Sequence, residues 1–306
     1  MFDIIGDIHG HASLLKRLLK EMGYKKGTSG YFHPERKIIF VGDFINRGPE
    51  IRQTVQMIRN MTENENAYAV LGNHEVNAVL FHLKDALKAP LLKKESLRSL
   101  SVGQTILEFR NYPEEWKGHL KWFRSLPFYL EFENLRVVHA CWKDDNIEIL
   151  KNELPTVKKS KQIFRTLVSD PKSTLSQAIL QTTRGIHHVL PPDLAVFDNH
   201  RRMHRFYRMR WWDDPTGLTF QQNSFETKFS LPEYTIPPEI LPVTVPYPED
   251  APPVFFGHYR RGNGPFIIKE NICCLDGSVT VKKRLIAYRW DGEKVLDPEK
   301  LVFVKM

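Results

Sequence analysis

The 306-residue chain has few cysteines and lacks a long apolar segment. Only three cysteines are present, and two of them, Cys273 and Cys274, are adjacent. This odd count does not fit a disulfide framework and favours a reducing compartment, so we expect the protein in the cytoplasm. The sequence has no run of about 18 apolar residues, so it predicts no membrane span. The first residues, "MFDIIGD", lack the basic and then apolar pattern of a signal peptide.

Acidic residues are in the minority, with 36 Asp and Glu against 44 Lys and Arg, and the formal net charge is +8. A basic balance keeps a protein soluble, and it can also attract nucleotides, phosphoproteins or nucleic acid. The hydrophobic content of 42% and the length are sufficient for a sizeable core. No internal repeat and no linker is evident in the sequence.

Short apolar runs alternate with helical patterns in the first third of the chain. The runs "FDIIG", "KIIFVGD" and "AYAVLGN" predict buried strands, and leucines at helical spacing predict a helix from Ala12 to Gly23. Further helices are expected from Pro49 and from His74. This alternation predicts an α/β fold with a parallel sheet covered by helices.

The remainder of the chain predicts insertions within one domain. We expect a single domain over residues 1–306, with helical inserts around 84–125 and 146–190. Residues 232–253 are dense in proline and are expected to run over the surface. Strands are predicted again in "LRVVHA", "HRFYRMRWW", "VFFGHY", "NICCLDGSV" and "RLIAYRWDG".

Five predicted strands end in polar side chains. These are Asp7 and His9, then Asp43, Asn46 and Arg47, then Asn73, His74 and Glu75, and later His139 and His258. In an open α/β sheet, ligands bind beyond the carboxyl ends of the strands, so we expect all five strands to deliver these groups to one edge. Each residue alone is more often a cap, a turn or an interior residue, but structure alone hardly explains the whole set. Glycine lets the backbone turn sharply near a ligand, and it precedes the polar residue at Gly6, Gly42, Gly72 and Gly257.

The donor types indicate two metal ions. Carboxylate, imidazole and amide oxygen without thiolate suit Mn, Fe or Zn, and we favour Mn. Two ions about 3.5–4 Å apart can clamp a phosphate and activate a bridging water that attacks phosphorus. Arg47 would hold phosphate oxygens, and His74 could protonate the leaving oxygen. Glu75 is interpreted as a helix-start acid stabilised by the helix dipole rather than as a catalytic group.

The segments "GDIHG", "GDFINRG", "GNHE", "HA" (139–140) and "GH" (257–258) resemble the calcineurin-like metallophosphoesterases. They are most similar to the phosphoprotein-phosphatase branch, which includes serine/threonine phosphatases and bacterial diadenosine tetraphosphatases. The resemblance implies a four-layer α/β/β/α sandwich with a helical insert. It implies Asp7 and His9 as ligands of a first metal, Asp43 as the bridging ligand, Asn73, His139 and His258 as ligands of a second metal, Arg47 as the phosphate clamp and His74 as the general acid.

The sequence departs from the family pattern at three places. In protein phosphatases the position of Asn46 is an aspartate that supports the catalytic histidine. The amide here either keeps the hydrogen bond to His74 without the charge or leaves His74 less easily protonated; the diadenosine tetraphosphatase group also lacks that aspartate. Cys141 replaces the usual glycine after "HA", which would narrow the site. The second phosphate-binding arginine has no clear counterpart, and the candidates are Arg184, Arg208, Arg210 and Arg260.

Three functions remain open at this point. The leading hypothesis is hydrolysis of phosphate monoesters, including phosphoprotein side chains. The alternative enzyme is a dinucleoside polyphosphate hydrolase, which Asn46 and the basic charge favour. A catalytically silent module that binds a phosphorylated partner or nucleic acid is the third, but such a module has no need of a general acid. We expect a phosphorylated substrate as the partner, and we expect neither a membrane nor nucleic acid.

Overall fold

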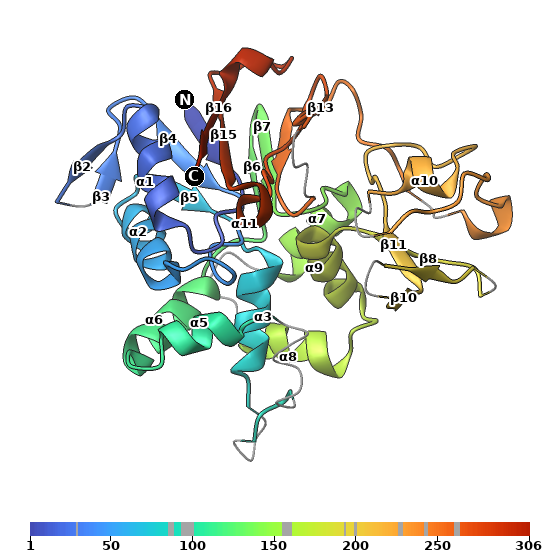
Figure 1. The fold of residues 1–306 in the computed structure, drawn as a ribbon, viewed down its shortest axis with the longest axis horizontal. Helices are drawn as coiled ribbons and strands as arrows, with labels where there is room; N and C mark the ends of the chain where they lie inside the picture. The colour runs from blue at the N-terminus through green and yellow to red at the C-terminus, as the bar shows by residue number, and fades with distance from the viewer. Residues whose placement is uncertain are drawn as a thin grey trace.

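Two five-stranded sheets form the centre of the computed structural model (Figure 1). The structure describes residues 1–28, 30–84, 89–92, 101–154, 161–192, 194–198, 201–225, 229–241, 244–259 and 264–306. The first sheet has the order β16-β15-β1-β4-β5, and the second has the order β13-β14-β12-β7-β6. Among the described residues, no helix combines the length and the apolar character that a membrane crossing requires.

The first sheet contains the predicted parallel strands β1 (Phe2–Ile5), β4 (Lys37–Phe40) and β5 (Ala67–Ala69). The helices between and after them are α1 (Ala12–Glu21), α2 (Ile51–Glu63) and α3 (Asn73–Phe81). The sheet is not wholly parallel, because β15 (Arg284–Trp290) pairs antiparallel with β1, and β16 (Leu301–Lys305) pairs antiparallel with β15. A separate hairpin, β2 (Lys25–Gly27) and β3 (Gly30–Phe32), precedes β4.

The second sheet is built from later segments of the chain. Its strands are β6 (Tyr129–Phe132), β7 (Leu135–Val138), β12 (Val254–Phe256), β13 (Ile267–Lys269) and β14 (Ile272–Cys274). In this sheet β12 lies parallel to both β7 and β14. The expectation that five polar strand ends share one sheet edge is therefore wrong in this respect: β7 and β12 belong to a second sheet, whose strand ends face those of the first.

The two sheets pack face to face between outer layers. Alternate side chains of β4 face opposite sides of the first sheet. Ile38 and Phe40 pack with α1 and α2, while Ile39 packs between the sheets. Cys273 lies between the sheets, and Cys274 packs on the outer face of the second sheet, so both thiols are buried as predicted. This arrangement confirms the four-layer α/β/β/α sandwich.

Helices lie in both regions in which helical inserts were predicted, although the strand β8 also lies in the second region, at His187–Val189. The described helices there are α5 (Gly103–Glu108), α6 (Pro113–Phe123), α7 (Asp144–Glu153), α8 (Lys161–Ser169) and α9 (Thr174–Arg184). Residues 85–88, 93–100 and 155–160 of these regions lie outside the described residues. Figure 1 shows α3, α5, α6 and α8 below the sheets, on the side of the strand ends that carry the polar residues.

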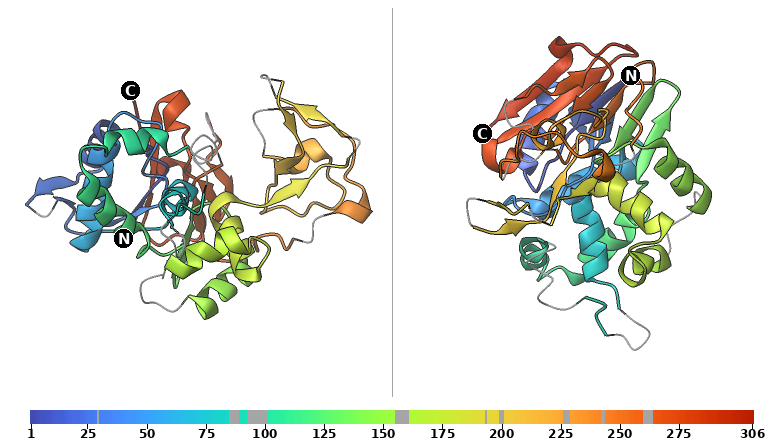
Figure 2. Two further views of the ribbon diagram at one scale, coloured as in Figure 1. Left: turned by 90° about the horizontal axis from the view of Figure 1, so that it is seen from below. Right: turned by 90° about the vertical axis from the view of Figure 1, so that its right-hand side faces the viewer.

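A small lobe lies beside the sandwich (Figure 2). It contains β8 (His187–Val189), β9 (Val196–Phe197), β10 (Met203–His204), β11 (Phe206–Arg208), α10 (Phe220–Asn223) and η1 (Pro238–Ile240). The lobe has its own cluster of buried side chains, among them Tyr207, Phe220 and Ile236. The proline-rich residues 232–253 are thus not confined to the surface, because Ile236 is buried here. The remaining short elements are α11 (Val279–Lys282) and η2 (Pro298–Lys300). The single-domain organisation stays a prediction.

Candidate active site

The carboxylate of Asp43 lies at the centre of a cluster of imidazoles. Its Oδ2 is 3.6 Å from His9 Nε2 and 3.8 Å from His74 Nε2, and its Oδ1 is 3.4 Å from His139 Nε2. The donor atoms form two groups, and within each group all atoms lie within 4.8 Å of one another. The groups are His9–Asp43–His74 and Asp43–His139–His258. Because Asp43 belongs to both groups, the donor set fits two neighbouring divalent ions that share one carboxylate.

Backbone carbonyls orient two of these imidazoles. His9 Nδ1 lies 3.0 Å from Ile45 O, and His139 Nδ1 lies 2.7 Å from Val41 O. Each carbonyl accepts a hydrogen bond from Nδ1–H, so Nε2 of both rings is left to point at Asp43. Hydrogen bonds of this kind fix the tautomer of histidines that bind metals. The contact between His139 and Val41 also joins the ends of the two sheets, since His139 follows β7 and Val41 follows β4.

Asp7 and Asn73, the other two expected ligands, lie at the edges of the cluster. Asp7 accepts a hydrogen bond from the amide of His258, with 3.1 Å between N and Oδ2. Asn73 Oδ1 is 3.2 Å from His139 Nε2, which is consistent with a place in the second group. Asp7 is in neither of the two donor groups described above; in the first group, His74 stands with His9 and Asp43 instead.

The buried charges perturb one another strongly. Burial raises the pKa of Asp7, and the neighbouring carboxylate of Asp276 raises it further. Burial lowers the pKa of His139, but the charge of Asp43, its hydrogen bond and the charge of Asp7 together outweigh burial and raise that pKa to about 10. Burial lowers the pKa of His258, and the guanidinium of Arg208 acts in the same direction. Clustered buried groups with shifted pKa values are typical of functional sites.

Five residues of the site have backbone conformations that L-residues rarely adopt. The φ angles are 44° for His9, 55° for Asp43, 68° for Asn46, 68° for Arg47 and 62° for His258. Each costs free energy, on the order of 1 kcal/mol or more, and such residues persist where the surrounding structure imposes them. Their concentration around Asp43 supports a functional rather than a purely structural role for these strand ends.

Gly42 and Gly257, two of the four glycines that precede polar residues, require glycine for different physical reasons. Gly42 has a φ of +102°, so it provides the sharp turn expected from the sequence. Gly257 does not have a positive φ; a Cβ there would lie 1.9 Å from Asp7 Oδ1. At Gly257 the requirement is space for the carboxylate and not backbone freedom.

Asn46 is held between His74 and a residue of α5. Asn46 Nδ2 lies 2.6 Å from His74 Nδ1, and Thr105 Oγ1 donates to Asn46 Oδ1 over 2.5 Å. The backbone N–H of Asn46 in turn donates to Thr105 Oγ1 over 3.1 Å. With its oxygen taken by Thr105, the Asn46 side chain presents its NH2 group to His74, which makes His74 Nδ1 an acceptor. Thr105 lies in the predicted helical insert, and no sequence motif marked it.

Glu75 holds the turn that carries Asp43. Its Oε2 accepts from the amides of Asp43 (2.9 Å) and Gly72 (3.1 Å), and its Oε1 accepts from those of Phe44 (2.8 Å) and Ile45 (3.3 Å). Burial, followed by the charge of Asp43, raises the pKa of Glu75 to about 7. Glu75 does lie in the first turn of α3 as the sequence predicted, but its main contacts are with the backbone around Asp43.

Several arginines surround the cluster. Arg47 Nη1 lies 3.0 Å from His9 Nε2, so its guanidinium reaches into the site. Among the candidates for a second phosphate clamp, Arg208 donates to His258 O over 2.8 Å, and Arg184 donates to Asn77 Oδ1 over 2.7 Å. Arg210 donates to Ser224 O, away from these ligands, and Arg260 lies outside the described residues. Arg208 is therefore the candidate with a direct link to the cluster.

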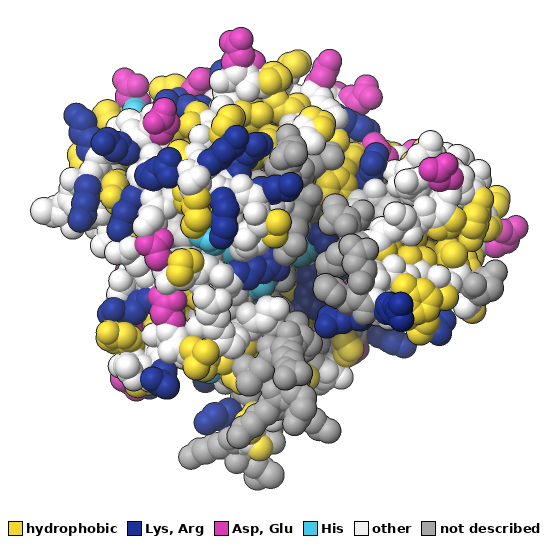
Figure 3. Space-filling view, in the orientation of Figure 1, with side chains coloured by type: hydrophobic (Ala, Val, Ile, Leu, Met, Phe, Trp, Pro, Cys, Tyr) yellow, Lys and Arg dark blue, Asp and Glu magenta, His cyan; other side chains and the backbone are white. Residues whose placement is uncertain are grey.

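The surface around the site is basic. Figure 3 shows Lys and Arg side chains around a hollow in the middle of this face, and histidine side chains are visible inside the hollow. Cys141, the departure next to His139, is fully buried and packs under the second sheet, so it does not narrow the site by lining it. A basic rim around a histidine-lined hollow favours anionic substrates.

Comparisons with known proteins agree with this geometry. The family model for calcineurin-like phosphoesterases matches residues 1–191. A bis(5'-nucleosyl)-tetraphosphatase PrpE [asymmetrical] of Geobacillus sp. is 33% identical over 153 residues, which are 47% of this chain and 59% of the relative. A symmetrical bis(5'-nucleosyl)-tetraphosphatase of Marinomonas sp. is 27% identical over 305 residues, 95% of this chain and 94% of that protein.

The chain matches only 59% of the length of that PrpE relative and of the next one, a PrpE of Halalkalibacterium halodurans. Among solved structures, a serine/threonine phosphatase from Saccharomyces cerevisiae superimposes with a TM-score of 0.51 at 14% sequence identity, over 99% of this chain and 78% of that one. At that identity the likeness concerns the fold alone. Together with the paired donor groups around Asp43, the family-model match over residues 1–191, more than half of the chain, shows that this chain belongs to the calcineurin-like phosphoesterase family.

Proposed function

We propose that the protein hydrolyses dinucleoside polyphosphates with two divalent metal ions. The proposal reverses the order of preference that the sequence alone favoured, in which phosphate monoesters came first. The reaction type is supported by the family and by the shared carboxylate of Asp43. The choice of substrate rests on the contact between Asn46 and His74, and the names of relatives such as the Marinomonas protein agree with it.

The Asn46 contact bears on the substrate because it weakens His74 as an acid. The NH2 group of Asn46 favours an imidazole whose Nδ1 carries no proton, whereas a strong general acid would be the doubly protonated ring. Cleavage of an alkyl phosphate releases an alkoxide, which needs a proton. Cleavage of a polyphosphate chain releases a phosphate, whose second pKa is about 6, so it leaves as an anion without one. The neutral Asn46–His74 pair therefore suits a phosphoanhydride better than a phosphoserine.

The other roles follow from the positions of the side chains. Divalent metals, with Mn as our preference, would be held by Asp7, His9 and Asp43, and by Asp43, Asn73, His139 and His258; when bound they polarise the phosphate and make water nucleophilic at neutral pH. Arg47 would bind the phosphate oxygens beside His9. His74 Nε2, which points at Asp43, would hydrogen-bond the leaving phosphate.

The lobe offers a place for the nucleoside. In the β8–β11 hairpin, Arg208 pairs with His187, and Phe206 pairs with Val189. These four side chains share one face, while Tyr207 on the opposite face is buried in the lobe. Arg208 contacts the backbone of His258, and Phe206, two residues further out, is 55% exposed.

A polyphosphate bound at the metals could thus continue along Arg208. Arg208 Nη1 donates to His258 O over 2.8 Å, so the guanidinium lies beside a candidate metal ligand and its other N–H groups could bind phosphate oxygens. The base would then stack on Phe206, which adds about 1–3 kcal/mol for base–aromatic contacts. Phe206→Ala should accordingly raise KM for diadenosine tetraphosphate about tenfold and leave kcat unchanged, whereas Phe303→Ala on β16 is the matched control.

The experiment that tests the proposal follows diadenosine tetraphosphate cleavage by chromatography, with metal-stripped and Mn-reloaded protein. We expect turnover that depends on added metal, and a loss of most turnover with retained metal in Arg47→Ala. Metal-loaded protein that leaves the dinucleotide intact would contradict the proposal. Retained affinity for the dinucleotide without turnover would instead support the silent binding module. A cytoplasmic location stays a prediction.

A further inference from the structure

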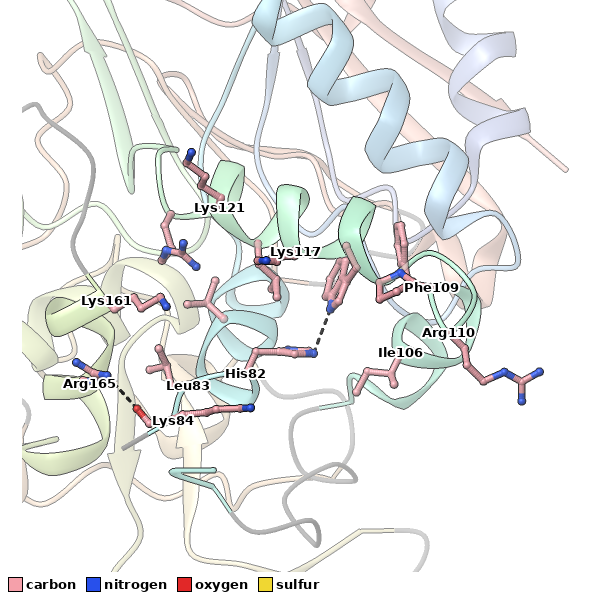
Figure 4. Close-up of a pocket in the computed structure, with 15 residues that line it drawn as sticks. His82, Leu83, Lys84, Ile106, Phe109, Arg110, Lys117, Lys121, Lys161 and Arg165 are labelled. Carbon is pink, nitrogen blue, oxygen red and sulfur yellow. Dashed lines mark hydrogen bonds between the residues drawn. The ribbon is translucent and has the colours of Figure 1, made fainter. Parts of the chain in front are cut away.

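A second pocket, of about 780 Å³, lies between α3, α5, α6 and α8 (Figure 4). The candidate metal site is at the N-terminal end of α3, where Asn73 and His74 lie, and the pocket is lined by the opposite end, with Val79 and Leu83. At about 1.5 Å per helical residue, the two sites are on the order of 10 Å or more apart. The pocket is therefore separate from the metal site.

The composition of the pocket is one-sided. Seven of its 15 lining residues are Lys or Arg, and none of the 15 is Asp or Glu. Figure 4 shows Lys121, Lys161 and Arg165 toward one side of the pocket, and Ile106 and Phe109 toward the other. Positive charge thus gathers on the first side, while the second side combines these apolar side chains with Arg110. Lys161 is also the first residue of α8, whose N-terminal end adds partial positive charge.

Arg124 strengthens the case for an anion. It is half-buried, and burial lowers its pKa. Within the described part of the chain, its guanidinium makes no ion pair or hydrogen bond. A half-buried cation without such a partner is energetically unfavourable. A guanidinium removed from water is normally paired, and an anionic ligand would supply the missing partner.

We propose that this pocket binds a small amphipathic anion, a single apolar chain or ring that ends in a carboxylate or phosphate. The anionic end would lie with Arg124, Lys121 and Lys161, and the apolar part would lie along Ile106 and Phe109. The volume falls within the range of about 300–1,000 Å³ that small-molecule sites occupy, which favours a small ligand over a protein segment.

The occupant would act on the metal site through α5. Thr105 on one side of this helix contacts Asn46, the next residue, Ile106, lines the pocket, and Gln104 Nε2 donates to Gly48 O over 2.8 Å. A ligand that displaces α5 would therefore alter the Thr105–Asn46–His74 contacts and change kcat. This coupling rests on the proposed function, whereas the binding does not.

The test is calorimetry on the full-length protein, with dodecanoate, dodecyl phosphate, dodecanol and inorganic phosphate as probes below their micelle concentrations. Lys121→Gln/Lys161→Gln removes two exposed charges of the pocket, and Lys25→Gln/Lys26→Gln on β2 is the control with the same charge change. We expect one dodecanoate or dodecyl phosphate per chain, with affinity at least tenfold weaker in the pocket variant and unchanged in the control. The tighter of the two identifies the preferred head group.

Three results would overturn the binding site: dodecanol binding as well as dodecanoate, inorganic phosphate binding as well as dodecyl phosphate, or equal affinities in both variants. For the coupling, saturating dodecanoate should change kcat for diadenosine tetraphosphate about fivefold or more, the lower end of typical coupling energies. Binding without any change in kcat would overturn the coupling. Because calorimetry needs no turnover, failure of the binding site can be distinguished from failure of the proposed function.

Discussion

Replacing Asn46 by aspartate should change substrate preference rather than overall activity. The side chain lies 2.6 Å from His74 Nδ1, so a carboxylate there would meet a protonated ring directly. Hydrogen bonds to a charged group contribute about 1.5–3 kcal/mol, against about 0.5–1.5 kcal/mol for neutral pairs. A gain of about 1.4 kcal/mol for the protonated form of His74 corresponds to about a tenfold larger protonated fraction. Turnover of substrates whose leaving group needs a proton should rise by the same factor.

The assay compares a phosphoserine peptide with diadenosine tetraphosphate on wild type and Asn46→Asp, both loaded with Mn. We expect kcat for the peptide to rise about tenfold, and kcat for the dinucleotide to change less than about threefold. Asn77→Asp, whose amide oxygen accepts from Arg184, adds the same charge near the site and serves as the control. An equal change for both substrates, or a fall for the peptide alone, would refute the reasoning about the leaving group.

Three further predictions concern the framework of the site. Glu75→Gln replaces one acceptor oxygen by NH2 and leaves two buried backbone amides without an acceptor. The free energy of unfolding, measured in urea, should therefore fall by about 2–6 kcal/mol. A loss below about 1 kcal/mol would contradict this role of Glu75. In the metal-free protein the pKa of His139 is about 10. Its proton is therefore bound at neutral pH and must leave when a metal binds to this imidazole. The metal affinity measured by calorimetry should rise about tenfold per pH unit between about pH 6 and 8. An affinity that does not depend on pH would exclude this proton release. Arg36→Met removes the 2.8 Å ion pair with the buried Asp3, which keeps Arg289 (3.3 Å) and Tyr24 (3.0 Å) as partners, so it should cost about 1.5–3 kcal/mol. Arg59→Met at an exposed ion pair should cost less than about 1 kcal/mol, and equal costs would refute this account.

The sequence predicted the parts of the fold that depend on local pattern. Strands β1 and β4 are largely buried on both faces and therefore read as continuous apolar runs, and the amphipathic pattern of α1 marked it clearly. The division into two sheets was not visible, because strand pairing between residues far apart leaves no local signal. The lobe was predicted only in part: the expected strand "HRFYRMRWW" contains β11, whereas β8, β9 and β10, with two or three residues each, were missed.

The candidate site was predicted in its residue types but not in its supporting contacts. Asp43, His9 and His139 could be found because each follows an apolar strand in a recognisable segment. Thr105 could not be found, since a single threonine in a helix carries no signal, and it reaches Asn46 only through the packing of α5. The role of Glu75 was missed for a similar reason, because its acceptor contacts with the Asp43 turn bridge 30 residues or more.

The central claim is that the site cleaves phosphoanhydrides of dinucleotides in preference to phosphate monoesters. The most direct measurement is kcat/KM of the Mn-loaded wild-type protein for diadenosine tetraphosphate and for a phosphoserine peptide, determined side by side. The account predicts a value at least tenfold higher for the dinucleotide, since its leaving phosphate needs no proton from His74. An equal or higher value for the peptide would contradict the account and restore the phosphomonoesterase hypothesis.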